Sequence, residues 1–254
     1  MPTNKIILGV IPARWASSRF PGKPLADING KPMVQWVSEQ VQKARLITEV
    51  IVATDDKRIY DVVFEFGGKA IMTNPSLPSG TDRIFQAISE LPEVEQLDSI
   101  INLQGDMPFF DPDIIVNLLS HIQDEDITTL VSLAKKSEIT DPNVVKVAMS
   151  WDNNVKNFGK AVYFSRSSIP FNSREYWHHI GIYAWKRNSL KKFISLSPSQ
   201  LETIEKLEQL RALENGMEIK ALKVKDAPIG VDTQKDLDRV RTLINNKNKS
   251  EGKF

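Results

Sequence analysis

Short apolar runs that stop at polar residues or proline recur through the first half of the chain. The run at residues 5–11 ends at Pro12, and the run at residues 49–54 ends at Asp55 and Asp56. Runs of this kind are typical of strands buried on both faces of a parallel sheet. They predict strands at residues 5–11, 49–54, 70–72 and 99–104. Helical periodicity lies between them at residues 34–44, 58–66 and 84–91. Strands that alternate with helices predict an α/β fold with a wound parallel sheet.

The second half of the chain is less regular and favours antiparallel strands. Strand-like runs lie at residues 144–149, 160–164 and 177–185. The pattern Ser199-Gln200-Leu201-Glu202 is a capping box and predicts one helix running towards Asn215 and Gly216. A last helix is predicted at residues 234–244. No repeat or linker divides the chain, so we predict a single domain over residues 1–245, with an antiparallel portion at about 150–195 and a flexible polar tail at 246–254.

Charge and composition narrow the function classes. The 33 basic and 32 acidic residues give a formal net charge of +1, which does not favour binding to nucleic acid or to an anionic membrane. The chain has no cysteine, which excludes disulfides, thiolate metal sites and cysteine nucleophiles and fits a reducing compartment. No apolar stretch approaches the ~20 residues of a membrane span, and the first five residues lack a signal-peptide layout. We therefore expect a cytoplasmic protein without membrane insertion.

A basic loop follows the first predicted strand. It holds the cations Arg14, Arg19 and Lys23 among small residues, proline and glycine. Ligands collect at the carboxyl ends of parallel strands, and such a loop can wrap the phosphates of a nucleotide. It can equally be a solvated basic loop. Because proline follows Gly22-Lys23 and no G-x-G-x-x-G is present, neither a Walker loop nor a dinucleotide fold is supported.

Two aspartates each follow an apolar segment of the chain. Asp106 comes just after the predicted strand at residues 99–104, and Asp232 follows the apolar segment at 229–231. Two such carboxylates can share a magnesium ion with phosphate oxygens. The alternatives are a structural role for Asp106 in a turn and capping of the last helix by Asp232 or Thr233.

Several polar residues elsewhere are weaker candidates. Ser79 to Arg83 precede a predicted helix, where exposed amides can hold a base or phosphate, although Thr81 or Asp82 can simply be the N-cap. The two-residue period of the 177–185 strand places His179 on the face opposite His178. The remaining candidates are Arg166, after the 160–164 strand, and Glu205, Glu208 and Gln209, which share one predicted helical face.

These segments together resemble the 3-deoxy-manno-octulosonate (Kdo) cytidylyltransferases, also called CMP-Kdo synthetases. Eight motifs occur in order over nearly the whole chain, which makes the resemblance specific. They are Ile11-Pro12-Ala13-Arg14 through Pro24-Leu25, Ala53-Thr54-Asp55-Asp56, Ser79-Gly80-Thr81-Asp82-Arg83, Gln104-Gly105-Asp106, Tyr163-Phe164-Ser165-Arg166, His179-Ile180-Gly181, Leu207-Glu208-Gln209-Leu210-Arg211 and Val231-Asp232-Thr233.

The resemblance implies a fold, an assembly and a reaction. The fold is that of the nucleotide-diphospho-sugar transferases, a mainly parallel sheet flanked by helices, with a smaller antiparallel portion that forms a homodimer. The reaction transfers CMP from CTP to the anomeric hydroxyl of Kdo, giving CMP-Kdo and pyrophosphate for lipopolysaccharide biosynthesis. The partners are CTP and an acidic eight-carbon sugar, and the cofactor is Mg²⁺.

The resemblance also implies roles for the matched residues. The catalytic residues are Arg14, Lys23, Asp106 and Asp232, and the two aspartates bind the metal. The triphosphate is held by Arg14, Arg19 and Lys23, and the cytidine lies near Ala13, Ser79 and Gln104. The sugar contacts Gln104, Arg83, Arg166, His179, Glu208 and Gln209.

One position departs from the family pattern. The family usually continues Gln-Gly-Asp with Glu-Pro, whereas this chain has Met107-Pro108. The change leaves Asp106 in place but alters the pocket on the sugar side. An 8-amino form of Kdo, or another acidic sugar such as a sialic acid, therefore stays open as the acceptor. An inactive nucleotide-binding regulator is a further alternative, against which the intact Lys23, Asp106 and Asp232 argue.

Overall fold

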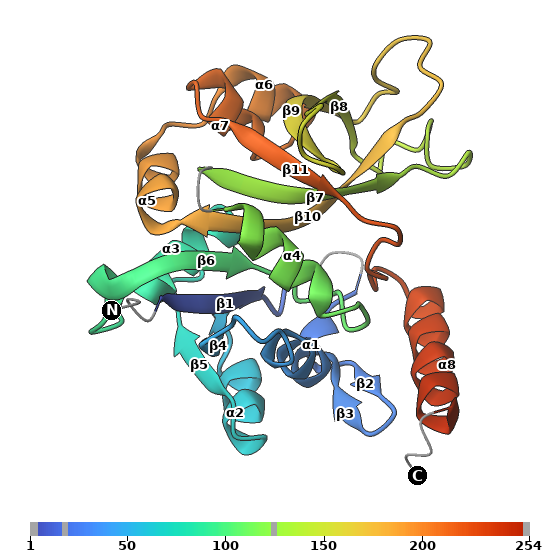
Figure 1. Cartoon of the computed structure of the whole chain (residues 1–254). Helices are drawn as coiled ribbons and strands as arrows, with labels where there is room; N and C mark the ends of the chain where they lie inside the picture. The colour runs from blue at the N-terminus through green and yellow to red at the C-terminus, as the bar shows by residue number, and fades with distance from the viewer. Residues whose placement is uncertain (1–4, 17–19, 123–125, 251–254) are drawn as a thin grey trace. The chain divides into compact units, whose positions relative to one another are not determined.

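The structure of the chain is a computed structural model that describes residues 5–16, 20–122 and 126–250, without the side chains of 247–250 (Figure 1). The chain divides into two compact units. Unit 1 comprises residues 1–97, 101–115 and 228–254, and unit 2 comprises residues 98–100 and 116–227. Within the described residues, no helix combines the length and the apolar character needed to cross a membrane.

Unit 1 is built on the predicted parallel strands. β1 (Ile6–Ala13) pairs in parallel with β4 (Glu49–Thr54), which pairs in parallel with β5 (Lys69–Met72). β6 (Leu97–Asn102) is divided between the units, with residues 98–100 in unit 2 and the others in unit 1. Val10 and Ile11 in β1 are fully buried, as expected for a central strand between two layers. Because β1, β4 and β5 run in the same direction, the segments that follow them emerge at one edge of the sheet.

The predicted helices of unit 1 are present with small shifts at their ends. They are α1 (Met33–Gln42), α2 (Lys57–Glu65), α3 (Gly80–Ser89) and α8 (Gln234–Ser250). The helix α8 runs past its predicted end at residue 244, into the segment predicted as a tail, and residues 251–254 lie outside the described residues. Two short 3₁₀ helices, η1 (Lys23–Leu25) and η2 (Val94–Gln96), and the hairpin β2 (Asp27–Ile28) and β3 (Lys31–Pro32) were not predicted. The helix α4 (Asp113–His121) was also not predicted.

Unit 2 is mainly antiparallel, which confirms the pattern predicted for the second half. β10 (Trp177–Lys186) pairs antiparallel with β7 (Ile127–Leu133), and β8 (Lys146–Trp151) pairs antiparallel with β9 (Phe158–Ser165). β11 (Ile219–Lys223) runs parallel to β7 and antiparallel to β9.

The prediction of one continuous helix after Ser199 was wrong. The capping box at Ser199 and Glu202 is present, but the helix breaks, leaving α6 (Gln200–Glu205) and α7 (Leu210–Glu214). Lys206 adopts a left-handed conformation with φ 54°, and its amide bonds back to the Glu202 carbonyl, which ends α6. Glu205, Glu208 and Gln209 therefore do not share a helical face. The preceding helix is α5 (Arg187–Ser195).

Candidate active site

A lysine and two aspartates from distant parts of the sequence converge in unit 1. Lys23 Nζ donates to Asp106 Oδ2 at 2.7 Å and to Asp232 Oδ1 at 3.2 Å. The lysine side chain is 15% exposed, whereas the Asp106 and Asp232 side chains are 28% and 45% exposed. A largely shielded cation therefore stands behind two carboxylates that solvent and ligands can reach. This is the convergence that the sequence predicted.

Backbone contacts explain why the two aspartates are neighbours. The Ile229 amide donates to the Phe109 carbonyl at 3.2 Å, and the Val231 amide donates to the Asp106 carbonyl at 2.9 Å. The segment before α8 is thus fixed against the segment after β6. Gly105 lets the segment after β6 pass close to the end of β1, because a Cβ there would lie 3.0 Å from the Pro12 carbonyl oxygen.

The N-cap of α8, for which Asp232 and Thr233 were both candidates, is formed by Thr233. Thr233 Oγ1 accepts from the Asp236 amide at 3.3 Å, and Asp236 Oδ2 accepts from the Thr233 amide at 2.9 Å. Thr233 and Asp236 therefore cap α8 reciprocally. The Asp232 carboxylate turns to Lys23 instead, so it is not needed as the cap.

The basic loop is held against α2 by contacts that the sequence did not reveal. The Arg58 guanidinium stacks 3.3 Å from the centre of a Trp15 ring, and Arg58 also forms a two-point bond to Asp56 at 2.8 and 2.6 Å. Gly22, with φ 70°, lies under the same indole, and a Cβ there would approach it to 2.9 Å. This packing fixes the backbone just before Lys23. A tryptophan and an arginine 43 positions apart carry no local signal of their contact.

Three other predicted nucleotide-site residues stand near strand ends. Arg14 donates to the Leu77 carbonyl at 3.2 Å, and Ala13 is the buried last residue of β1. Gln104 begins the turn that leads to Asp106, and its carbonyl accepts from the Met107 amide at 3.2 Å. Arg19 lies outside the described residues.

Ser79 and Arg83 organise the start of α3. Ser79 is the N-cap, whose hydroxyl accepts from the Asp82 amide at 3.1 Å, so the alternative caps Thr81 and Asp82 are not used. Arg83 is completely buried and donates to Asp55 Oδ2 at 2.7 Å and to Thr73 Oγ1. Burial lowers the pKa of Arg83, and the charge of Asp55 opposes that shift. Arg83 therefore joins α3 to the residues just after β4 and β5.

The remaining predicted sugar residues belong to unit 2. The Arg166 side chain donates to three backbone carbonyls. Gln209 is 8% exposed, and its Nε2 is buried without a hydrogen-bond partner among the described residues. Such an unpaired buried donor is unusual and calls for a partner. The pKa of Tyr183 lies well above its usual value because the ring is buried, and the charge of Glu208 adds to that shift.

His179 is a buried, neutral imidazole. Its Nε2 lies 3.1 Å from Thr129 Oγ1, and its ring packs edge-on against Phe164 at 4.9 Å. Burial lowers the pKa of His179 to about 3. It therefore carries no charge at neutral pH and can contact a ligand only as a neutral donor or acceptor.

This pKa predicts a pH-dependent stability. An unfolded histidine titrates near pH 6.5, so between pH 6.5 and 3 the unfolded chain binds a proton that the folded chain does not, and stability falls as the pH falls. His179→Phe removes that proton. Its unfolding free energy relative to wild type should rise by about 2 kcal/mol between pH 6.5 and 5, at about 1.4 kcal/mol per unit. Urea denaturation at each pH measures this, and a constant difference between the two proteins would contradict it.

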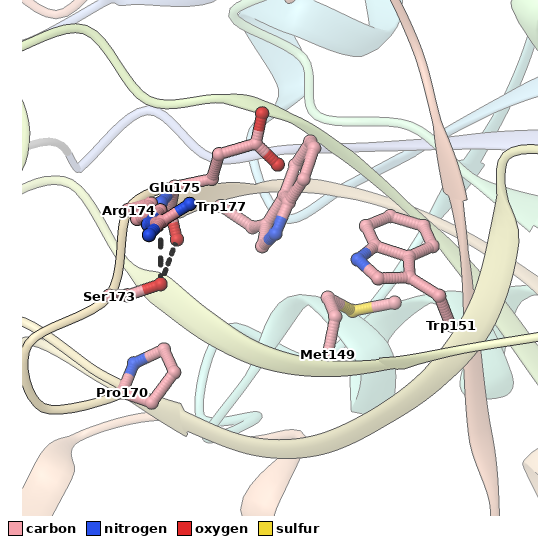
Figure 2. Close-up of a pocket in the computed structure, with 7 residues that line it drawn as sticks. All are labelled: Met149, Trp151, Pro170, Ser173, Arg174, Glu175 and Trp177. Atoms are coloured by element: carbon pink, nitrogen blue, oxygen red, sulfur yellow. Dashed lines mark hydrogen bonds between the residues drawn. The ribbon is translucent and has the colours of Figure 1, made fainter.

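A separate pocket lies in unit 2 (Figure 2). Its volume is about 440 Å³. Two tryptophans, a methionine, a proline, a serine, an arginine and a glutamate line it. These residues are Met149, Trp151, Pro170, Ser173, Arg174, Glu175 and Trp177. Of the predicted site residues that the structure describes, none lines it.

Similarity to known proteins shows which family this chain belongs to. Residues 8–219 match the family described as Cytidylyltransferase. A protein of Paramagnetospirillum magneticum named 3-deoxy-manno-octulosonate cytidylyltransferase is 45% identical over 238 residues, covering 92% of this chain and 96% of that protein. One of Brucella anthropi with the same name is 46% identical over 240 residues, covering 93% and 96%. The chain belongs to the 3-deoxy-manno-octulosonate cytidylyltransferase family.

Solved structures agree with this family. A structure described as CMP:2-keto-3-deoxy-manno-octonic acid synthetase complexed with CTP matches with a TM-score of 0.87 and 40% identity, covering 96% of this chain and all of that one. A glucose-1-phosphate thymidylyltransferase structure from Bacillus anthracis, at 17% identity and a TM-score of 0.66, shares the fold over 93% of this chain and 94% of its own. The predicted nucleotide-diphospho-sugar-transferase fold is thus confirmed, and the chain is a nucleotidyltransferase. The roles of the individual site residues stay predictions.

Proposed function

We propose that this chain transfers CMP from CTP to the anomeric hydroxyl of Kdo, giving CMP-Kdo and pyrophosphate, as a cytoplasmic step of lipopolysaccharide biosynthesis. The observation that carries the proposal is the convergence of Lys23, Asp106 and Asp232 in unit 1. Support for the substrate comes from the family and from the CTP-bound relative. CTP carries a polyanion that needs a cation and a metal, and this trio supplies the lysine and two carboxylates.

The donor set fits the implied magnesium ion. Asp106 and Asp232 both reach one ammonium, so their carboxylates are close enough to serve one small cation, and Mg²⁺ prefers such oxygen ligands. Within the described residues, no group of three or more acidic or histidine side chains could hold a metal alone. Phosphate oxygens of CTP and water would therefore complete the shell. Held by Asp106 and Asp232, a magnesium ion would neutralise phosphate charge and polarise the α-phosphate.

The protein groups have distinct tasks in the transfer. The sugar oxygen bonds to the α-phosphorus, the bond from that phosphorus to the pyrophosphate oxygen breaks, and the hydroxyl proton passes to water. Lys23, Arg14 and Arg19 hold the triphosphate and neutralise its charge, while Ala13, Ser79 and Gln104 lie near the cytidine. No covalent protein nucleophile is required, because positioning and charge neutralisation supply most of the catalysis.

The acceptor is a carboxylate with several hydroxyls. We assign its contacts to Gln104, Arg83, Arg166, His179, Glu208 and Gln209. The buried Nε2 of Gln209 supports this assignment, because a sugar hydroxyl would satisfy a donor that the described residues leave unpaired. The neutral His179 suits a hydroxyl, whereas an arginine fork suits the carboxylate.

The proposal is tested by the mass of the product. Incubation with CTP, Mg²⁺ and Kdo should give CMP-Kdo and pyrophosphate. Parallel reactions contain 8-amino-3,8-dideoxy-octulosonate or a sialic acid instead. Because Met107 replaces the acidic residue usual in the family, the 8-amino sugar is the critical comparison. A higher kcat/KM for either substitute would contradict Kdo as the acceptor, and no CMP conjugate with any sugar would contradict the proposed activity.

We also propose that the antiparallel portion at about residues 150–195 forms a homodimer. Apolar side chains outside the core gather in or beside it. Phe171 is 97% exposed, Val162 is 54% exposed and Val155 is 39% exposed. Large exposed apolar groups of this kind mark interaction surfaces.

Phe171→Glu should therefore shift the chain from dimer to monomer. Light scattering after gel filtration should give twice the 28.7 kDa chain mass for wild type and about one chain mass for the variant. Phe64→Glu is the matched control, since Phe64 is 75% exposed but lies on α2, and it should stay dimeric. A monomeric wild type would end the dimer proposal.

A further inference from the structure

Lys146 in β8 is a buried lysine that no step of the proposed reaction uses. Its side chain is fully buried, and its ammonium donates to the carbonyls of Asp141 at 2.8 Å, Val144 at 2.7 Å and Arg166 at 2.6 Å. An ammonium has three N–H donors, so this one is fully used on neutral oxygens. Burial lowers the pKa of Lys146; the charges of Asp141 and Glu205 oppose that shift, and the charge of Arg166 adds to it.

The Arg166 side chain bonds to the same loop and also to the end of α6. Its Nε donates to the Glu205 carbonyl at 2.9 Å, its Nη1 to the Pro142 carbonyl at 2.9 Å, and its Nη2 to the Lys206 carbonyl at 3.3 Å. Lys146 and Arg166 thus bond together to six backbone carbonyls, which come from residues 141–144, 166 and 205–206. The two cations therefore join the loop at 141–144, the residue after β9 and the end of α6.

The nearby carboxylate of Glu205 bonds to other groups and not to the Arg166 guanidinium. Glu205 accepts from the Ser165 hydroxyl at 2.6 Å and from the Arg166 backbone amide at 3.0 Å. In the described parts of the chain the Arg166 guanidinium makes no ion pair, and its partners are the three carbonyls. A guanidinium has five N–H donors, so one remains on each terminal nitrogen, and two such donors are what a carboxylate accepts.

We propose that Lys146 is a positioning residue for the acceptor: it holds Arg166 by its backbone oxygen so that the two remaining guanidinium donors receive the sugar carboxylate. The proposal rests on the proposed function, in which Arg166 contacts the sugar. We assign Lys146 no substrate contact, because all three donors of its ammonium are used on backbone carbonyls. Without its ammonium, the carbonyls of Asp141, Val144 and Arg166 lose that donor, which loosens the loop at 141–144, although the Asp141 carbonyl keeps the Val144 amide at 3.2 Å. That loop also contains Pro142, whose carbonyl accepts from Arg166 Nη1 and so orients the guanidinium.

The test compares KM for Kdo with KM for CTP in variants of Lys146. Lys146→Met should raise KM for Kdo by about tenfold, which is the loss expected when one hydrogen bond to a charged group is misplaced. KM for CTP should change by less than about twofold. Lys160→Met is the matched control, since Lys160 forms an exposed ion pair with Glu218 in the same unit, and it should leave both constants unchanged. Thermal melting verifies folding, and Lys146→Gln, which keeps a donor, repeats the comparison if the methionine variant does not fold.

A double mutant distinguishes positioning from general stability. If Lys146 acts through Arg166, adding Lys146→Met to Arg166→Ala should not raise KM for Kdo further. Independent, additive effects would overturn the proposal, as would an unchanged KM for Kdo in a folded Lys146 variant. Failure of both Lys146 variants to fold would assign the lysine to stability alone and overturn it too. Failure of the proposed function looks different, because wild type would then make no CMP-Kdo.

Discussion

Replacing Asp106 by Asn is expected to lower kcat by roughly a thousandfold or more, which corresponds to several kcal/mol of lost charge stabilisation. The amide has nearly the same shape and can still accept the bond from Lys23 that the structure shows at 2.7 Å. It lacks the negative charge with which Asp106 would hold the proposed Mg²⁺. The effect should therefore fall on turnover and leave the fold intact. Pyrophosphate release at saturating CTP and Kdo measures it.

The control for this variant is another aspartate of unit 1. Asp61 pairs with Lys57 on the exposed face of α2 at 2.6 Å, so Asp61→Asn removes one carboxylate and one ion pair without touching the site. It should keep wild-type kcat. Asp232→Asn should behave like Asp106→Asn. Near wild-type turnover by a folded Asp106→Asn enzyme would remove Asp106 from the metal site.

Asp55→Ala should destabilise the fold by about 3 kcal/mol, because it leaves a buried cation without its counter-charge. Arg83 has no exposed surface, and Asp55 is its only ion-pair partner among the described residues, at 2.7 Å. The pair joins α3 to the residue after β4, so its loss should loosen the edge of the sheet where Ser79 stands. The free energy of unfolding in urea gives the magnitude.

Two further variants identify the cause of that loss. Glu49→Ala breaks the exposed Lys69 pair, also 2.7 Å long, and should cost less than about 1 kcal/mol. Adding Arg83→Met to Asp55→Ala removes the stranded charge and should restore part of the stability. A double variant that is less stable than Asp55→Ala would show that the unpaired charge is not the cause.

The strands of unit 1 could be predicted because a strand buried on both faces must be apolar throughout. β4 lies at the predicted residues 49–54, and β1 differs only at its ends. β7 escaped prediction because Thr128 and Thr129 are buried inside it, and Thr129 satisfies its hydroxyl on carbonyls of β10. That satisfaction is a tertiary contact, which a pattern of polarity along one segment does not contain.

The break between α6 and α7 also depends on tertiary contacts. Glu202 is joined to Arg211 by two bonds of 2.8 and 2.5 Å, an arrangement that replaces the straight helix. Helical spacing alone gives no sign of it. The capping box, in contrast, is local and was predicted correctly.

In the candidate site, too, some contacts could be predicted from the sequence and others could not. The strand-end rule and the family motifs predicted that Lys23, Asp106 and Asp232 would meet. They gave no indication of the stacking of Arg58 on Trp15, nor of Lys146 as a donor to three carbonyls. Backbone carbonyls have no sequence signature, since every residue carries one. Residues that act through the backbone are therefore found only in a structure.

The central claim is that Lys23, Asp106 and Asp232 meet around one triphosphate and one metal ion. Anomalous diffraction from crystals grown with CTP and Mn²⁺, a scattering substitute for Mg²⁺, tests it most directly. We predict a metal peak in contact with an oxygen of Asp106, an oxygen of Asp232 and a CTP phosphate, with Lys23 Nζ bonded to the same triphosphate. A metal peak away from both aspartates, or a triphosphate bound out of reach of Lys23, would contradict the account.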